Sequence, residues 1–190
     1  MQRAHGFTLV ELMVVLAIIA ILTTMAAPSL RHVLLSTTMS SNVNAFLADM
    51  RFARSESIRR GGGVTMCRSD APEAANPVCA HDSGAGSTGW VSGWIIFYDL
   101  DSNGERGVAE TVLRVQSPIA AINAISDANA LSSKFRSTAP GRLLRADAAT
   151  TLQFGAQPMF AANEQRTVCI NPGGRARIAG DGTVACGSAQ

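Results

Sequence analysis

A chain of 190 residues has room for one domain plus an additional element, and its net charge of +2 with 16% charged residues is unremarkable. The four cysteines include no Cys-x-x-Cys pair and no histidine at zinc-site intervals, which argues against a zinc-binding module. No phosphate-binding loop is present, because the three glycines at 61–63 are not followed by Lys and Ser or Thr. The three histidines form no pattern with cysteines or acids, so we expect neither an enzyme nor a bound cofactor.

Charge is distributed unevenly along the chain. Residues 1–60 carry six Arg against three acids, and residues 61–133 carry three Arg against eight acids. Residues 134–190 carry one Lys and six Arg against three acids. The C-terminal third is therefore a candidate for contact with a polyanion.

The N-terminus combines a short polar leader, residues 1–6, with a long apolar run. Leu12–Leu30 is a stretch of 19 uncharged residues, enough to cross the hydrocarbon core of a membrane as a helix. Arg3 orients the N-terminal end toward the cytoplasm. We expect residues 7–30 to form the transmembrane half of a helix.

A secretory signal peptide is the alternative for this segment, and it fits poorly. Glu11 lies inside the apolar run, the run is longer than the apolar region of a typical signal peptide, and Pro28 follows its only pair of small residues. A carboxylate at that depth costs about 2.5–3.5 kcal/mol on insertion scales, so it should have a functional partner.

Residues Gly6 to Glu11, which read Gly-Phe-Thr-Leu-Val-Glu, resemble the type III signal of type IV pilins and type II secretion pseudopilins. The resemblance implies that prepilin peptidase cuts an inner-membrane precursor after Gly6 and methylates the new N-terminus at Phe7. It also implies a periplasmic domain that is later assembled into a cell-surface pilus. In assembly Glu11 would pair with the terminal amine of a neighbouring pilin subunit, which agrees with the cost of an unpaired carboxylate in lipid. Pro28 sits where the pilin helix kinks or melts, since proline removes a helical hydrogen bond.

The helix is expected to continue past the membrane over residues 31–60. Apolar and small residues recur there at steps of three and four, as an amphipathic stripe of Val43, Phe46, Leu47, Met50, Ala53 and Ser57. The glycines at 61–63 end the helix. A single helix of about 50 residues therefore leads into a globular domain over residues 61–190.

Beyond the glycines the pattern predicts antiparallel strands. Trp94–Tyr98 is the strongest, and Thr111–Val115 pairs back with it across a turn at Asp99–Gly107. Val64–Cys67 is a short strand followed by a loop over residues 68–89. Weaker strands are expected near Leu131–Phe135, Thr151–Phe154, Arg166–Ile170 and Arg175–Ile178.

The long helix, the strand after the glycines and the segment Trp90-x-x-Gly93-Trp94-Ile-Ile-Phe97 resemble the GspH/FimT group of minor pilins and pseudopilins. The resemblance covers nearly the whole chain. It implies an α+β fold, in which the helix packs on antiparallel sheets.

Asp99, Asp101, Asn103 and Gly104, followed by Glu110, match the pattern of an EF-hand calcium loop. An EF-hand needs helices on both sides and usually an apolar residue at its eighth position, whereas strands flank this loop and Arg occupies that position. Asn-Gly beside Asp is also a strong hairpin signal. We therefore expect a metal-free hairpin, with a calcium site as the alternative.

The even number of cysteines in an exported domain is typical of two disulfides. Three connectivities are possible. The favoured one joins Cys67 to Cys79 and Cys169 to Cys186, because each pair brackets a turn-rich loop.

Arg175 and Arg177 are two residues apart, so on a strand they point to the same side. The preceding glycines allow a sharp approach of the backbone and leave room for a bulky ligand, and a disulfide around the loop would limit its entropy. Gly174-Arg175-Ala176-Arg177 resembles the GRxR motif of FimT-type minor pilins, which implies that Gly174, Arg175 and Arg177 bind DNA. On charge alone, further candidates are Lys134, Arg136, Arg142, Arg145 and Arg166.

Two functions remain open. The first is non-specific binding of extracellular DNA by a minor pilin during natural transformation. The second is structural, either a FimU-like subunit that primes the pilus tip or a GspH-type pseudopilin of type II secretion. In the second case Arg175 and Arg177 would be solvated side chains on a terminal hairpin, without a ligand.

Overall fold

The structure is a computed structural model of the full chain, and it describes residues 8–81, 88–127, 133–144 and 150–187; within these, the side chains of residues 25–29, 31 and 32 are not described. The chain divides into two compact units, Met1–Thr37 and Thr38–Gln190. Gly6, Phe7 and Arg145 lie outside the described residues, as does the side chain of Pro28.

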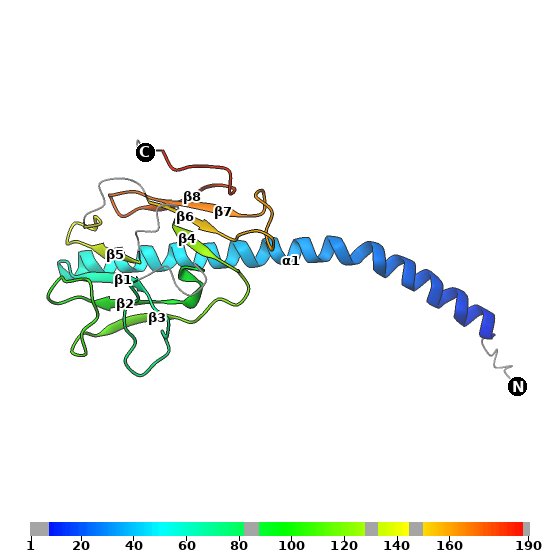
Figure 1. The fold of residues 1–190 in the computed structure, drawn as a ribbon, viewed down its shortest axis with the longest axis horizontal. Helices are drawn as coiled ribbons and strands as arrows, with labels where there is room; N and C mark the ends of the chain where they lie inside the picture. Colours follow the sequence, from blue (N-terminus) through cyan, green and yellow to red (C-terminus); the bar gives the residue numbers. More distant parts are fainter. Residues whose placement is uncertain (1–7, 82–87, 128–132, 145–149, 188–190) are drawn as a thin grey trace, which may run out of the picture. The chain divides into compact units, whose positions relative to one another are not determined.

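Helix α1 spans Leu9–Arg60 without interruption (Figure 1). Its end is formed by the three glycines, all of which have positive φ angles. The amide of Gly62 donates to the carbonyl of Ser57 at 2.6 Å, which satisfies one of the carbonyls that the helix leaves open. The prediction of one long helix ended by glycines is confirmed.

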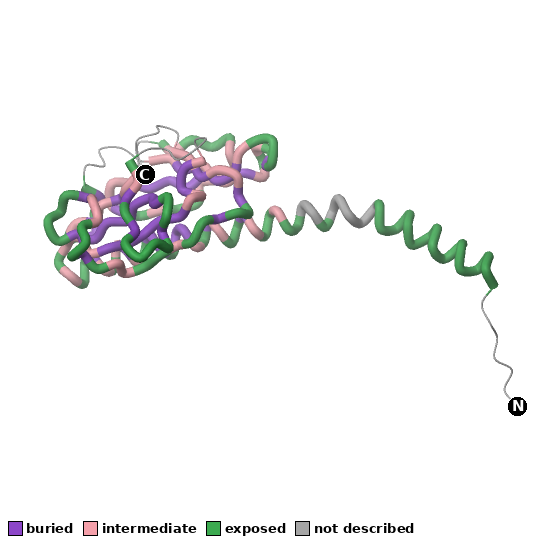
Figure 2. The backbone as a smooth tube through the Cα atoms, turned by 60° about the horizontal axis from the view of Figure 1, so that its bottom comes forward, coloured by how far each residue is buried: buried purple, intermediate pink, exposed green. Residues whose placement is uncertain are grey.

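The described side chains of α1 in the first unit are exposed through Leu34, including large apolar ones such as Leu12, Leu16 and Ile19 (Figure 2). Over the residues that the structure describes, no helix combines the length and the apolarity that crossing a membrane requires.

Two four-stranded antiparallel sheets belong to the second unit. The first has the order β3-β2-β1-β5, with β1 at Val64–Arg68, β2 at Trp94–Tyr98, β3 at Val112–Gln116 and β5 at Lys134–Ser137. A 3₁₀ turn, η2 at Trp90–Ser92, precedes β2. The expected β2–β3 hairpin is present, with the acidic loop at its tip.

The second sheet has the order β4-β6-β7-β8. Its strands are β4 at Ile125–Asp127, β6 at Thr150–Phe154, β7 at Arg166–Ile170 and β8 at Ala176–Gly180. Sequence analysis missed β4, whose three residues are too few for a clear alternation, and placed β5 and β8 slightly too early. The α+β prediction is confirmed.

The helical part of the second unit packs against both sheets through Phe46. Its ring makes edge contacts with Trp90 of η2, with Trp94 of the first sheet and with Phe154 of the second, at centroid distances of 5.2–5.6 Å. This arrangement explains why the predicted amphipathic stripe is buried: Val43, Phe46, Leu47, Met50 and Ala53 are at most 3% exposed.

One acid lies in this interior. Asp49 is 6% exposed, accepts a hydrogen bond from the indole of Trp94 at 2.8 Å and forms an ion pair with Arg114 at 2.6 Å. Both carboxylate oxygens are thus satisfied, which a buried charge requires.

Candidate functional site

The predicted arginine pair lies at the turn between β7 and β8. Gly174 donates to the carbonyl of Asn171 at 2.9 Å, and Asn171 donates to the carbonyl of Arg175 at 3.0 Å. The side-chain oxygen of Asn171 accepts from the amide of Arg175 at 3.0 Å. Asn171 therefore closes the turn from both its main chain and its side chain.

Gly174 serves the close approach of the backbone that the sequence suggests, but it does not leave room for a ligand. It is buried and has a φ of +74°, a conformation that favours glycine. A Cβ at this position would collide with the carbonyl oxygen of Gly141. The space expected for a ligand is filled by protein backbone, so Gly174 shapes the turn and offers little surface to a partner.

Arg175 and Arg177 are both exposed. Arg175 is the last residue before β8, and Arg177 stands on β8 opposite Cys169 of β7. β8 is the edge strand of its sheet (Figure 1). The two side chains are thus presented from a short hairpin at a sheet edge.

A third predicted residue, Arg142, reaches the same place from the segment between β5 and β6. Leu143 donates to the carbonyl of Pro172 at 3.0 Å, which joins that segment to the β7–β8 turn. The Cα of Arg142 lies 3.8 Å from the position of a Cβ on Gly174, and its side chain is exposed.

Arg54 of α1 completes the group, and sequence reasoning missed it. Its Nε lies 2.9 Å from where a Cβ on Gly141 would be, so its side chain passes directly over that glycine. Only its position between apolar residues of the stripe could have signalled a rim location, and nothing in the sequence links it to Gly141. We call Arg54, Arg142, Arg175 and Arg177 the arginine surface.

Within the described part of the chain, Arg54, Arg142 and Arg175 have no ion pair with a carboxylate. Other arginines are paired, for example Arg59 and Arg60 with Glu56. These three arginines therefore retain positive charge that no described carboxylate neutralises.

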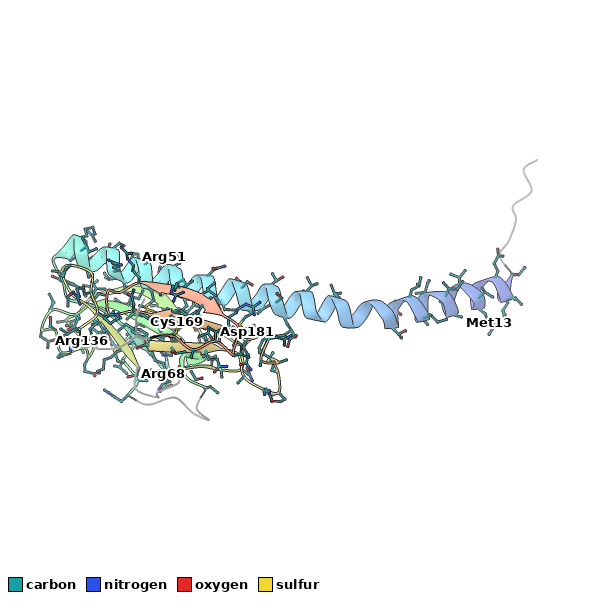
Figure 3. All side chains as sticks on the ribbon, turned by 90° about the horizontal axis from the view of Figure 1, so that it is seen from above. Met13, Arg51, Arg68, Arg136, Cys169 and Asp181 are labelled. Carbon is teal, nitrogen blue, oxygen red and sulfur yellow. A yellow bond between two sulfur atoms is a disulfide. The ribbon has the colours of Figure 1, made fainter. Side chains whose placement is uncertain are left out.

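The other described candidates, Lys134, Arg136 and Arg166, have partners of their own. Lys134 pairs with Glu105, and Arg136 lies 3.8 Å from the Asp99 carboxylate (Figure 3 labels Arg136 on β5). Arg166 donates to the carbonyls of Asn163 and Gln165.

Two disulfides are present, Cys67–Cys79 and Cys169–Cys186, the two local pairs that the spacing favours. The second one ties the C-terminal segment to β7, next to the strand that carries Arg177 (Figure 3 labels Cys169). It therefore restrains the sheet edge at which the arginines stand.

At the N-terminus, Glu11 has a local role that the sequence analysis did not include. The amide of Glu11 donates to the hydroxyl of Thr8 at 3.2 Å, and the amide of Thr8 lies 3.5 Å from the Glu11 carboxylate. This reciprocal pair is a capping box at the start of α1. Glu11 thus stabilises the first helical turn of its own chain.

Comparisons with known proteins agree with the fold. The family model described as type II transport protein GspH matches residues 42–174, and the prokaryotic N-terminal methylation motif matches residues 1–27. The first match ends at Gly174, so Arg175 and Arg177 lie outside it. No curated protein matches.

Two crystal structures of the type IV minor pilin FimU of Pseudomonas aeruginosa strain PAO1 are similar in fold. The form in space group P21 is 18% identical with a TM-score of 0.54, over 80% of this chain and 95% of that chain. The form in space group P65 is 17% identical with a TM-score of 0.50, over 80% and 99%.

The methylation motif and the pilin fold indicate an inner-membrane-anchored precursor that prepilin peptidase processes and that assembles with other pilin subunits into a pilus. The GspH model spans well over half of the chain. The protein therefore belongs to the GspH family, as a minor type IV pilin or pseudopilin.

Proposed function

We propose that this minor pilin binds extracellular DNA without sequence preference through the arginine surface, for uptake in natural transformation. The observation that carries the proposal is the convergence of Arg54, Arg142 and Arg175 from three separate segments without a carboxylate partner among the described residues. A guanidinium group binds phosphate oxygens in a bidentate way, so such a cluster suits a phosphate backbone.

The composition of the surface favours phosphate contact over reading of bases. The three aromatic residues of the C-terminal third, Phe135, Phe154 and Phe160, are all buried. Base stacking on a single strand needs exposed aromatic rings. Contacts to phosphate alone position a protein on DNA but carry no sequence information.

Binding of this kind should be weak and sensitive to salt. Non-specific affinities typically lie at about 10⁻⁴–10⁻⁶ M, with a log–log salt slope of about −0.9 for each phosphate contacted on duplex DNA. Several copies of a subunit on one pilus would raise the effective affinity.

The test is a salt series of duplex DNA titrations with residues 36–190, which include the whole second unit. Changing Arg175→Ala together with Arg177→Ala should remove most binding and flatten the salt slope by about two contacts. Changing both to Lys should retain part of the affinity, because the charge survives without the bidentate fork.

The matched control is Arg59→Ala with Arg60→Ala, which removes the same charge from side chains already paired with Glu56. This control should bind DNA as wild type does. Equal affinity of the wild type and the Arg175/Arg177 variant would exclude the site. No binding by wild type at low salt would leave the structural role at the pilus tip or in a pseudopilus as the better reading.

We also propose that Glu11 acts in assembly, by exchanging its capping contact with Thr8 for the terminal amine of a neighbouring subunit. Glu11→Ala should still reach the membrane but enter pili poorly. Normal incorporation would contradict the proposal. Mass spectrometry of the mature protein should begin at a methylated Phe7, whereas a start near Ala27 would indicate signal-peptide processing.

A further inference from the structure

Three carboxylates converge in the loop that joins β2 to β3. One oxygen from each of Asp99, Asp101 and Glu110 lies within 4.8 Å of the other two. Asp99 and Glu110 are buried, and Asp101 is exposed. Three like charges at this separation repel one another, so the arrangement requires positive charge or donors nearby.

Donors already satisfy most of these oxygens. Glu110 accepts from the amides of Leu100 and Gly107 at 2.7 and 2.8 Å. Asp99 uses Oδ2 to accept from the hydroxyl of Thr65 at 2.8 Å and from the amide of Gly104 at 3.0 Å.

The other oxygen of Asp99 is the exception. Its Oδ1 is buried and has no hydrogen-bond partner among the described residues, on a residue that is 2% exposed. The guanidinium of Arg136 lies 3.8 Å from the Asp99 carboxylate, but the oxygen that it approaches is Oδ2. A buried carboxylate oxygen without a donor is rare in native proteins and calls for a partner such as water or an ion. Asp99 is one of the three cluster residues, so its unpartnered oxygen points to a ligand beside this carboxylate.

We infer that the cluster binds a calcium ion through Asp99, Asp101 and Glu110. All three side chains offer carboxylate oxygens, the ligands that hard divalent cations prefer. Calcium accepts irregular sites of six to eight oxygens, whereas magnesium demands a near-ideal octahedron. The residues also keep the EF-hand order, with Gly104 at the sixth position and a φ of +80°.

The inference revises our expectation of a metal-free hairpin. That expectation rested partly on Arg106 at the eighth loop position. In the structure the Arg106 guanidinium donates to the main-chain carbonyls of Pro77 and Glu110, at 3.2 and 3.3 Å. It is thus engaged by main-chain oxygens and forms an ion pair with none of the three carboxylates among the described residues.

The test is a melting-temperature titration of the full-length chain in non-ionic detergent with CaCl₂, and with MgCl₂ in parallel. An affinity in the range of extracellular modules, about 10⁻⁴–10⁻³ M, is expected. At ten times the Kd, calcium should raise the melting temperature by about 3–6 °C. Magnesium should give a clearly smaller shift.

The decisive variant is Asp101→Asn, because Asp101 is exposed and Asn can still accept from the amide of Asn103 at the turn. It should fold and lose at least about tenfold in calcium affinity. The matched control is Glu73→Gln, an exposed acid outside the loop, whose amide oxygen can still accept from Ser117. The control should respond to calcium as wild type does.

Two results would overturn the site. One is a wild-type melting temperature that does not change with calcium up to about 10 mM, ten times the upper limit of the expected Kd. The other is an equal calcium response in wild type and Asp101→Asn, which would mean that the ion acts elsewhere.

Discussion

The β2–β3 loop and the β7–β8 turn both connect hairpin strands, and both carry charged side chains. The loop buries two of its charged side chains, whereas the turn exposes its own. In the first, Asp99 and Glu110 are buried and bonded to main-chain amides, and burial raises the pKa of Asp99. In the second, Arg175 and Arg177 are exposed at a sheet edge.

The difference separates charges that build the fold from charges that the fold displays. Acidic side chains turned inward are held by donors from β1 and from the loop itself, so they fix the course of the chain. Arginines turned outward contribute little to stability, since surface charges are well solvated. Of the two, Arg175 has no carboxylate partner among the described residues and remains available to a ligand.

The largest expected effect concerns the two disulfides. Cys67 lies on β1, next to the strand that leads into the acidic loop, and Cys169 lies on β7, which leads into the turn with the arginines. Cys67 and Cys79 are at most 5% exposed and pack with Ile95 and Phe97. Replacing both by Ala should lower the free energy of unfolding by about 4 kcal/mol. Urea unfolding of residues 36–190 measures the loss.

The matched variant replaces Cys169 and Cys186 by Ala. Cys186 is only half-buried in an exposed terminal segment, so the loss should be about 2 kcal/mol. Equal losses of unfolding free energy from the two disulfides would show that the segment near the arginines stabilises the fold as much as the segment near the acidic loop does.

Gly174→Val tests whether the glycine of the arginine motif serves the fold. The positive φ and the collision with Gly141 should together cost about 3 kcal/mol of unfolding free energy. Gly187→Val, at a position with no atom within 4 Å of the new Cβ, should cost almost nothing. A stable Gly174→Val protein with lost DNA binding would instead assign the glycine to the ligand.

Arg142→Ala and Arg136→Ala compare a displayed arginine with a paired one. Removing Arg142 should weaken DNA binding by about threefold to tenfold, the effect of one phosphate contact, and leave the melting temperature unchanged. Removing Arg136, which faces buried Asp99, should lower the melting temperature and leave DNA binding unchanged. DNA titration and thermal melting of both variants measure these two effects. If both variants changed in the same way, the distinction between a displayed and a paired arginine would be wrong.

The smallest effect concerns Glu56, a charge that is paired but near the surface. Hydrogen bonds from Arg59 and then Arg60 lower the pKa of Glu56 from 4.5 to about 2. Its folded-state pKa is depressed, so its stabilisation is complete above pH 4.5 and is lost as the pH falls toward 2.

Because its partner Arg59 is solvated, the contribution should stay below about 0.5 kcal/mol. Glu56→Gln should therefore be slightly less stable than wild type at pH 6 and nearly equal to it close to pH 2. A difference that persists unchanged at low pH would assign the effect to packing.

Much of the fold could be predicted from the chain alone. The stripe of Phe46, Leu47 and Met50 has a helical period, the glycines at 61–63 end any helix, and Trp94–Tyr98 is apolar and aromatic like a buried strand. These are local signals, because a period or a break is complete within a few residues. Strand β4 lacked such a signal and was missed.

The composition of the candidate sites was decided by tertiary structure. Arg175 and Arg177 are neighbours in sequence, but Arg54 and Arg142 join them only because the Gly141 backbone lies against Gly174. Likewise the spacing of Asp99 and Glu110 suggested a loop, whereas the unpartnered Oδ1 of Asp99 depends on what surrounds it. Whether a charge is paired or displayed is set by residues distant in sequence, and sequence periodicity carries no information about them.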